Sequence, residues 1–262
     1  MLLHLIADYG PNDPAFVEVA QRLYQHLPNA HVQYLSVPPF STLATGFWIA
    51  QLGLNDGPTS RCIYHNCAPR HDNPDARMDN EGEGLTFAEL CNGVKVVGVW
   101  AGYTLSFIKE FATSIHSVDV SRAGSQFRSR DVFPKTAASL LNGDRYSLGT
   151  PIPASQVPDI PTNRVAWIDG YGNLKTTIPA SSVPLTPSTP VTVRVGDVVS
   201  NAVFSDGSFE VPEGTLAFAP GSSGWTIGSK SCRWIELFLR GGSAWQRFGK
   251  PRIGQNIVYS PA

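Results

Sequence analysis

The sequence predicts an α/β N-terminal domain with a mostly parallel sheet, followed by an all-β C-terminal domain built as an antiparallel barrel. In the first half, short apolar runs alternate with helical patterns. In the second half, β-branched and aromatic runs are separated by Gly, Pro, Asn, Asp and Ser, and a proline-rich segment lies between the halves. Alternating strands and helices favour a parallel sheet with helices on its faces, whereas strands divided by turn residues favour antiparallel pairing.

The first domain is expected over residues 1–148. Residues 2–6 form an apolar run that suits a buried strand. Asp13 can then cap a helix with Pro14 at its first position, and apolar side chains at helical spacing follow from Phe16 to Tyr24. Further strands are expected at 31–37, 62–64 and 94–100, and further helices at 41–52, 103–111 and 136–141.

A linker is expected over residues 149–163, because four prolines lie there and proline fits neither a helix interior nor a central strand. The second domain then covers residues 164–262. Its strands are expected at 164–168, 191–195, 198–204, 215–218 and 234–239.

Composition excludes several classes of protein. The chain of 262 residues carries 20 basic and 21 acidic side chains, which argues against a nucleic acid partner. No apolar stretch reaches about 18 residues, so we expect no membrane span. We expect no signal peptide, because the N-terminal segment has no positively charged region and no small-residue cleavage site. We expect no disulfide framework, since the four cysteines are few and scattered. A cytoplasmic location is therefore the expectation.

The first motif with chemical meaning is the end of the first strand, residues 6–13. A carboxylate at Asp8 would lie at the carboxyl edge of a parallel sheet, where ligands bind in open α/β folds. There it could accept two hydrogen bonds from a vicinal diol such as ribose. The alternative is that Asp8 and Asp13 are ordinary turn and cap residues.

Two further motifs are polar. Residues 125–134 place Arg128, Ser129, Arg130 and Asp131 beside phenylalanines, which fits either a polar cluster on an apolar base or an Arg130–Asp131 pair capping a helix. Residues 167–174 carry an acid, an aromatic and an amide spaced by glycines. This second pattern fits a site for an ammonium group and an amide-bearing ring, and equally a hairpin turn.

Together the motifs resemble the S-adenosylmethionine hydroxide adenosyltransferases and their relatives, the fluorinases and chlorinases. The resemblance spans nearly the whole chain in order. The matching segments are 7–10 followed by Asp13, 35–40, 126–131, 168–173, and 231–237 followed by 241–244. The resemblance implies a homotrimer that holds S-adenosylmethionine as substrate at the subunit interface. It also implies displacement of methionine from the ribose C5′ carbon by a small nucleophile.

The resemblance also implies roles for single residues. Asp8 would hold the ribose hydroxyls, and Asn173 would hydrogen-bond adenine. Asp169 and Ser231 would hold the amino and carboxylate groups of the methionine part. The remaining implied binding residues are Phe40, Phe127, Tyr171, Gly241 and Ser243.

The residues that manage the nucleophile depart from the family pattern. Asn66 stands where hydrolase members have an aspartate, and Arg128 replaces a histidine. Arginine keeps its proton and cannot act as a base. Ser129 falls where fluorinases have a halide-contacting serine, so Ser129, Arg128 and Asn66 are the candidate catalytic residues. Either Arg70 or Arg77 could replace a missing arginine.

Three outcomes stay open at this point: adenosyl transfer to an anion, water activation by His65, His71 or Asp72, and binding of an adenosyl compound without turnover. We favour adenosyl transfer. A different class is a zinc site at His65, Cys67 and His71, because His and Cys suit zinc. Neither a C-x2-C pair nor an H-E-x-x-H helix supports that class, so we expect no metal.

Overall fold

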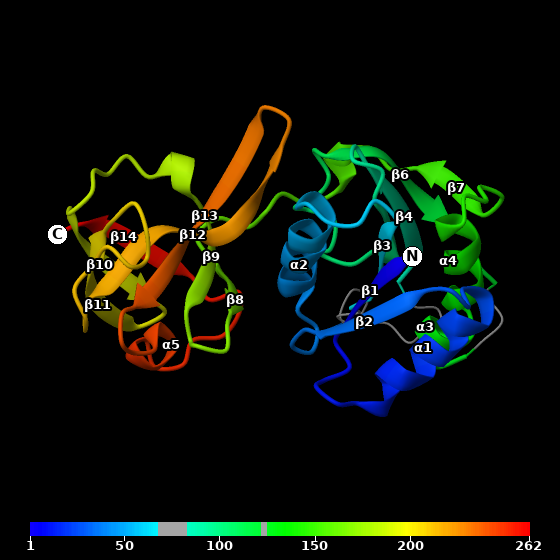
Figure 1. Cartoon of the computed structure of the whole chain (residues 1–262), viewed down its shortest axis with the longest axis horizontal. Coiled ribbons are helices and arrows are strands. Elements are labelled where there is room, and N and C mark those ends of the chain that lie inside the picture. Colours follow the sequence, from blue (N-terminus) through cyan, green and yellow to red (C-terminus); the bar gives the residue numbers. More distant parts are fainter. Residues whose placement is uncertain (68–82, 122–124) are drawn as a thin grey trace. The chain divides into compact units, whose positions relative to one another are not determined.

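The computed structural model describes residues 1–67, 83–121 and 125–262, and the chain is a two-domain α/β and β fold (Figure 1). By its contacts the chain divides into two compact units, Met1–Asp159 and Ile160–Ala262. Each unit contains one mixed sheet of seven strands.

The first unit alternates strands and helices over most of its length. Its elements are β1 (Leu2–Ala7), α1 (Pro14–His26), β2 (His31–Ser36), α2 (Thr42–Leu54), β3 (Arg61–Asn66), β4 (Leu85–Leu90), β5 (Lys95–Val99), β6 (Ala112–Val118), α3 (Arg128–Asp131), α4 (Phe133–Leu141), β7 (Leu148–Pro151) and the 3-10 turn Ala154–Gln156. The Asp13 cap of α1 is confirmed, because its carboxylate accepts the Ala15 N–H at 2.8 Å.

The first sheet has the order β2-β1-β3-β5-β4-β6-β7. The pairs among β2, β1, β3 and β5 are parallel, whereas β4 runs antiparallel to both β5 and β6, and β6 runs antiparallel to β7. The prediction of a mostly parallel sheet was therefore wrong for half of the sheet. The physical reason is a tight turn after β4, where the Leu90 N–H donates to the Val94 carbonyl and Gly93 has a φ of 82°. A turn this short can only reverse the chain.

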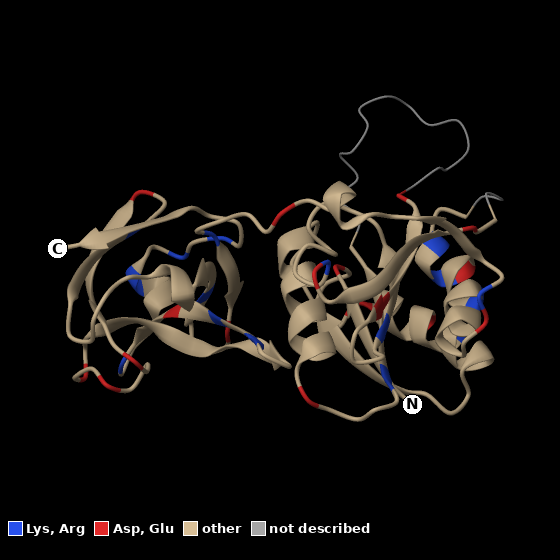
Figure 2. Cartoon of the chain, turned by 90° about the horizontal axis from the view of Figure 1, so that it is seen from above, with Lys and Arg blue, Asp and Glu red and all other residues tan. Residues whose placement is uncertain are grey.

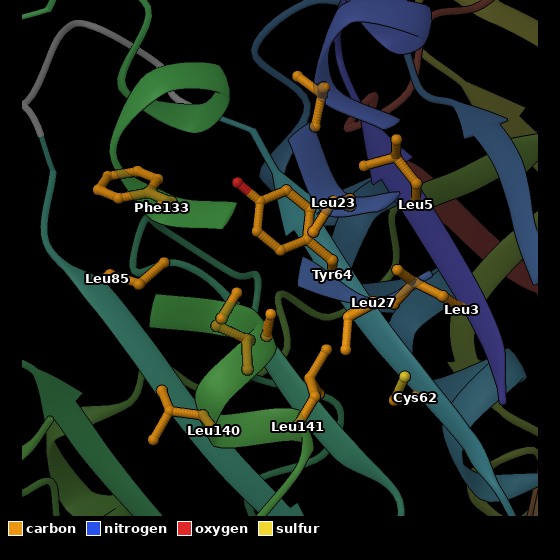
Figure 3. Packing of buried hydrophobic residues seen from close by; sticks show 14 of the residues in the cluster. Leu3, Leu5, Leu23, Leu27, Cys62, Tyr64, Leu85, Phe133, Leu140 and Leu141 are labelled. Carbon is orange, nitrogen blue, oxygen red and sulfur yellow. The ribbon is translucent and has the colours of Figure 1, made fainter. Parts of the chain in front are cut away.

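Helices cover both faces of the parallel part. Helices α1, α3 and α4 contact one another on one side, which we call the α1 face, and α2 contacts β1 and β3 on the other, the α2 face (Figure 1). The core on the α1 face is formed by apolar side chains from β1, β3, α1 and α4 (Figure 3). It includes Leu3, Leu5, Leu23, Leu27, Cys62, Tyr64, Phe133, Leu140 and Leu141.

The helix predicted at 103–111 is absent; the structure has a series of turns there. Thr104 and Ile108 donate their N–H groups to carbonyls three residues back. Gly102 has a φ of 45°, and the Thr104 hydroxyl donates to the Val99 carbonyl. Hydroxyl groups that bond nearby backbone compete with helix formation. This segment packs closely on α2, since a Cβ at Gly46 would lie 2.2 Å from the Tyr103 carbonyl oxygen.

The second unit is built almost entirely of strands. Its elements are β8 (Val165–Ile168), β9 (Leu174–Pro179), the 3-10 turn Ala180–Ser182, β10 (Pro190–Val195), β11 (Val198–Phe204), β12 (Leu216–Ile227), β13 (Lys230–Leu239), α5 (Ala244–Arg247) and β14 (Ile257–Pro261). The order is β14-β10-β11-β12-β13-β9-β8. One pair, β11 with β12, is parallel, so the expectation of a purely antiparallel sheet needs this correction.

The second sheet curls so that its edge strands meet at one end. Arg164, just before β8, forms a bridge with Asn256, just before β14. The Ile257 N–H also donates to the Asn163 carbonyl at 2.8 Å. The segment expected as a linker is not all connection, because β7 ends at Pro151 and pairs with β6 in the first sheet.

Charged residues are distributed over both units, with Lys and Arg interspersed among Asp and Glu (Figure 2). Within the described ranges, no helix is both long and apolar enough to cross a membrane.

Candidate functional site

The strand order of the first sheet reverses beside β1. The chain passes from β1 through α1 to β2 on one side, and then through α2 to β3 on the other side. The connection from β1 to β2 therefore lies on one face and the connection from β2 to β3 on the other, and the edge where the chain changes face is where open α/β sheets bind ligands. Asp8 follows β1, and Cys67 follows β3. The fold thus brings these two side chains to the same edge.

Asp8 is held by groups that are distant in the sequence. Its N–H donates to the Asn66 carbonyl at 3.2 Å, which extends the pairing of β1 with β3. Its carboxylate oxygen Oδ2 accepts the Phe40 N–H at 3.0 Å. Phe40 has a φ of 63° and its ring is about half exposed. Phe40 therefore contributes its backbone to the carboxylate, and its ring lies at the surface of the same edge.

The Cys67 thiol is a buried neighbour of the Asp8 carboxylate. It donates a hydrogen bond to the Asp8 carboxylate and contacts the Thr45 hydroxyl, and both Cys67 and Thr45 are fully buried. The Thr45 hydroxyl donates to the Ser41 carbonyl at 2.9 Å, and Ser41 caps α2 by accepting the Ala44 N–H. Burial, followed by the charge of Asp8, raises the pKa of the Cys67 thiol to about 12, so the thiol keeps its proton at neutral pH. We call Asp8, Phe40, Thr45, Asn66 and Cys67 the Asp8 site.

His65 lies one layer below the Asp8 site. Alternation along β3 places it on the α2 face with Cys67, and it is opposite Ile6 on β1 and Gly98 on β5. Its ring packs over Gly98, where a Cβ would lie 2.2 Å from the imidazole. Among the described residues neither ring nitrogen has a hydrogen-bond partner. Burial lowers the pKa of His65 to about 3, so the expected role in water activation is not supported for this residue.

Ser129 lies on the opposite side of the sheet edge. Its hydroxyl accepts the Tyr9 hydroxyl proton at 2.7 Å, and its carbonyl accepts the Tyr64 hydroxyl proton at 2.7 Å. Tyr9 packs edge-on against Phe127, and both rings join the core of the α1 face. The structure therefore brings Phe127 and Ser129 next to Tyr9, with Ser129 itself buried.

The two arginines of the 125–134 motif make separate contacts. The Arg128 guanidinium lies 4.9 Å from the centre of the Phe133 ring. Arg130 forms ion pairs with Asp131 at 2.7 Å and with Glu18 at 2.6 Å. The Arg130 guanidinium, followed by the Ser125 hydroxyl, lowers the pKa of Asp131 to about 2. The expected Arg130–Asp131 ion pair is therefore present, but it caps neither α3 nor α4, since neither helix start has a side-chain cap hydrogen bond.

In the second unit, Asp169 is bonded inside its own turn. Its oxygen Oδ1 accepts the N–H groups of Tyr171 and Asn173, both at 3.0 Å, and Oδ2 accepts the Asn173 side-chain amide at 2.9 Å. The Tyr171 ring is 84% exposed. Asn173 is buried, and within the described chain its Oδ1 has no hydrogen-bond partner. The residues 169–173 therefore form a self-bonded turn between β8 and β9.

The structure brings this turn next to the segment 241–245. The Trp245 N–H donates to the Gly172 carbonyl at 2.8 Å, and a Cβ at Gly172 would lie 2.1 Å from the Ser243 hydroxyl. Ser243 caps α5, and Gly241 has a φ of 77°. Two motifs about 70 residues apart in the sequence are thus adjacent.

Ser231 does not join this group. It lies at the far end of β13, where its hydroxyl is 3.1 Å from that of Thr226. The turn at 169–173 adjoins Leu237, which pairs with Leu174. Six residues of strand correspond to about 20 Å, so Ser231 is remote from Asp169 within the second unit.

Four candidate residues, Arg70, His71, Asp72 and Arg77, lie outside the described residues. The zinc proposal depends on His71, and no group of three metal-binding side chains is present in the ranges that the structure describes.

No family model matches the sequence, and no curated protein matches it. The chain is similar to a number of solved structures. One is an uncharacterized conserved protein from Thermotoga maritima, with a TM-score of 0.77 and 19% identity over 98% of this chain and 100% of that chain. Another is a conserved hypothetical protein from Thermus thermophilus, with a TM-score of 0.64 and 17% identity over 98% of this chain and 99% of that chain. At these identities the similarity establishes the fold alone.

Sequence reasoning missed two members of the Asp8 site. Thr45 lies inside an apolar helix, and Cys67 was considered only as a zinc ligand. Their contact with Asp8 depends on the register of β1 with β3 and on the position of α2, which no local pattern reveals.

Proposed function

We propose that this protein binds S-adenosylmethionine or a related adenosine compound at the Asp8 site. The observation that carries the proposal is the position of Asp8 at the edge where the strand order reverses, with its carboxylate held by the Phe40 N–H and the Cys67 thiol. A carboxylate fixed in this way suits the hydroxyl groups of ribose, because charged acceptors make the stronger hydrogen bonds. The exposed Phe40 ring offers an apolar surface beside it.

The proposed reaction is displacement at the ribose C5′ carbon. A nucleophile forms a bond to C5′ while the C5′–sulfur bond breaks. The electron pair of the broken bond stays on sulfur, which neutralises the sulfonium and gives methionine. The products are adenosine or a 5′-halo-adenosine. Because the sulfonium is already a good leaving group, the protein has to supply position rather than acid catalysis.

An anionic nucleophile is favoured over water. Attack by water releases a proton, and three of the groups beside Asp8 are not suited to accept it. The pKa of His65 is lowered to about 3 by burial, the Cys67 thiol is protonated, and Asn66 has no basic side chain. Chloride and fluoride need no deprotonation. Ser129 and Arg128 remain part of the proposal as anion contacts.

The ligand contacts in the second unit also remain proposals. The adjacency of Gly172 and Ser243 supports a common role for the turn 169–173 and the segment 241–243. Ser231 has the weakest support, since it lies far along β13. The homotrimer belongs to the same proposal, and light scattering on the purified chain tests it.

A second candidate is an adenosyl-binding protein without turnover. It is favoured by Arg128, which packs on Phe133 in place of a residue that could accept a proton.

The experiment is incubation of the purified chain with S-adenosylmethionine, with and without chloride or fluoride, followed by chromatography. Formation of a 5′-halo-adenosine, or of adenosine, supports transfer. Saturable binding by calorimetry without either product supports the second candidate. Absence of binding to both S-adenosylmethionine and adenosine contradicts the proposed function.

A further inference from the structure

We infer that Cys67 is a positioning residue, whose thiol donates a hydrogen bond to Asp8 and fixes that carboxylate for the ligand. The inference deepens the proposed function and rests on it. Cys67 does not itself touch the ligand in this account; it acts through Asp8.

The first support is a continuous line of polar contacts. The Cys67 thiol donates to Asp8, which follows β1, and contacts the Thr45 hydroxyl on α2. Thr45 donates to the Ser41 carbonyl, and Ser41 caps the same helix. The line therefore ties the end of β1, the end of β3 and the start of α2 together. The Phe40 N–H holds Asp8 from the same turn before α2.

The second support is the state of the thiol. Cys67 is fully buried, so water does not compete for its proton. Its raised pKa follows from burial and from the nearby carboxylate, and a protonated thiol can donate where a thiolate would repel Asp8. A thiol is a weak donor in water but gains importance in a buried network.

The third support comes from the other cysteines. Cys62 lies five residues earlier on β3 but faces the α1 core, and its thiol is 3.6 Å from the Leu2 carbonyl. Cys91 is exposed, and Cys232 lies in the second unit. Cys62 is thus a matched control, because it is a buried cysteine on β3, the strand that Cys67 follows, and it points away from Asp8.

The consequence for the ligand is preorganisation. A carboxylate that rotates freely must be ordered when the ligand binds, whereas one held by two donors already has its oxygens in place. Loss of the thiol should therefore weaken binding of a ribose ligand although no contact with the ligand is removed.

The first measurement is the infrared S–H stretching band, which does not require a ligand. In a Cys62→Val, Cys91→Ser, Cys232→Ser background, the remaining band belongs to Cys67. We expect it at the low frequency of a strongly hydrogen-bonded thiol, and we expect Asp8→Asn to shift it upward. A band that Asp8→Asn leaves unmoved overturns the inference.

The second measurement is the dissociation constant for adenosine and for S-adenosylmethionine. Cys67→Val removes the donor at nearly constant volume, and we expect about a tenfold loss of affinity. Cys67→Ser keeps a donor and should restore affinity to within about threefold of the parent chain. Cys62→Val should leave affinity unchanged, and melting curves verify that each variant is folded.

The outcomes separate the two hypotheses. If the parent chain binds adenosine and Cys67→Val binds it equally well, the positioning role is wrong and the proposed function stands. If Cys67→Ser is as weak as Cys67→Val, the side chain acts through packing, which also overturns the inference. If the parent chain binds neither compound, the proposed function fails and the role of Cys67 in ligand binding fails with it.

Discussion

Two carboxylates followed by aromatic and glycine residues lie in the two units, and they are held in opposite ways. Asp169 accepts three hydrogen bonds, all from Tyr171 and Asn173 within its own turn. Asp8 accepts from Phe40, which is 32 residues away, and from Cys67, which follows a neighbouring strand. One carboxylate stabilises a turn, and the other is placed by tertiary structure.

This difference teaches how to rank similar motifs. Where a carboxylate is bonded by its nearest neighbours, the turn that it stabilises already explains why an acidic residue occupies the position. A carboxylate that several distant segments bring to the reversal point of a sheet has a position that local structure does not require. We therefore expect substitutions at Asp8 to affect mainly ligand binding, and substitutions at Asp169 to affect mainly stability.

The largest expected effect is that of Asp8→Ala on binding. Removing a charged acceptor of ribose hydroxyls should weaken adenosine binding by roughly 10- to 100-fold, measured by calorimetry, because such hydrogen bonds contribute about 1.5–3 kcal/mol. The matched control is Asp13→Ala, which removes a helix cap a few residues away and should cost about 1 kcal/mol of stability with no change in affinity. Equal affinities of Asp8→Ala and the parent chain would contradict the comparison.

The second prediction concerns pH and separates the two units. All six histidines lie in the first unit, and burial lowers the pKa of His65 from 6.5 to about 3. Between these values the unfolded chain binds more protons than the folded chain, so stability is lost as pH falls below about 6.5. The expected loss is about 1.4 kcal/mol per pH unit between pH 6 and pH 4.

Urea unfolding at several pH values tests this prediction. His65→Leu should remove most of the slope, whereas His26→Gln serves as a control, because His26 is exposed. An unchanged slope in His65→Leu would show that another group is responsible. The second unit has no histidine, so its free energy of unfolding should depend only weakly on pH over the same range.

The third prediction compares close contacts of two glycines. Gly98→Ala would place a Cβ 2.2 Å from the His65 ring, and we expect a loss of about 1–3 kcal/mol in the free energy of unfolding. The double variant Gly98→Ala, His65→Ala should recover most of this loss. Gly172→Ala meets Ser243 and also has a φ of 83°, so Ser243→Ala should rescue it only in part. Full rescue at Gly172 would mean that backbone strain contributes little there.

The smallest expected effect is that of Asp169→Ala on the second unit. The variant removes the acceptor of two backbone N–H groups, and we expect a loss of about 1 kcal/mol in unfolding free energy. Differential scanning calorimetry measures it. A variant with parental stability but no affinity for adenosine would reverse the ranking of the two carboxylates.

Much of the fold could be predicted from local patterns. The cap at Asp13, the apolar spacing of α1 and the apolar run of β1 each act within a few residues, and each was located correctly. The antiparallel half of the first sheet was not predicted, because β4 and β6 contain Ala, Ser and His in place of a β-branched run. The turns at 103–111 resemble a helix in sequence, since the buried residues Leu105 and Ile108 have helical spacing.

The candidate site was predictable only in part. Asp8 could be found because it comes directly after an apolar strand. A residue in that place lies at the carboxyl edge of the sheet. Its partners Cys67 and Thr45 could not, because their contact depends on the pairing of Ala7 with Asn66 and on how α2 packs. The self-bonded state of Asp169 was open in the sequence, where a site and a hairpin turn had equal support.

The most direct test of the central claim is an amide NMR titration with adenosine on the full chain. The Phe40 amide bonds the Asp8 carboxylate, and the Tyr171 and Asn173 amides bond that of Asp169, so the three signals report on the two carboxylates separately. The account predicts a large, saturable shift of the Phe40 signal that Asp8→Ala abolishes. A Phe40 signal that stays fixed while adenosine is in excess would contradict it.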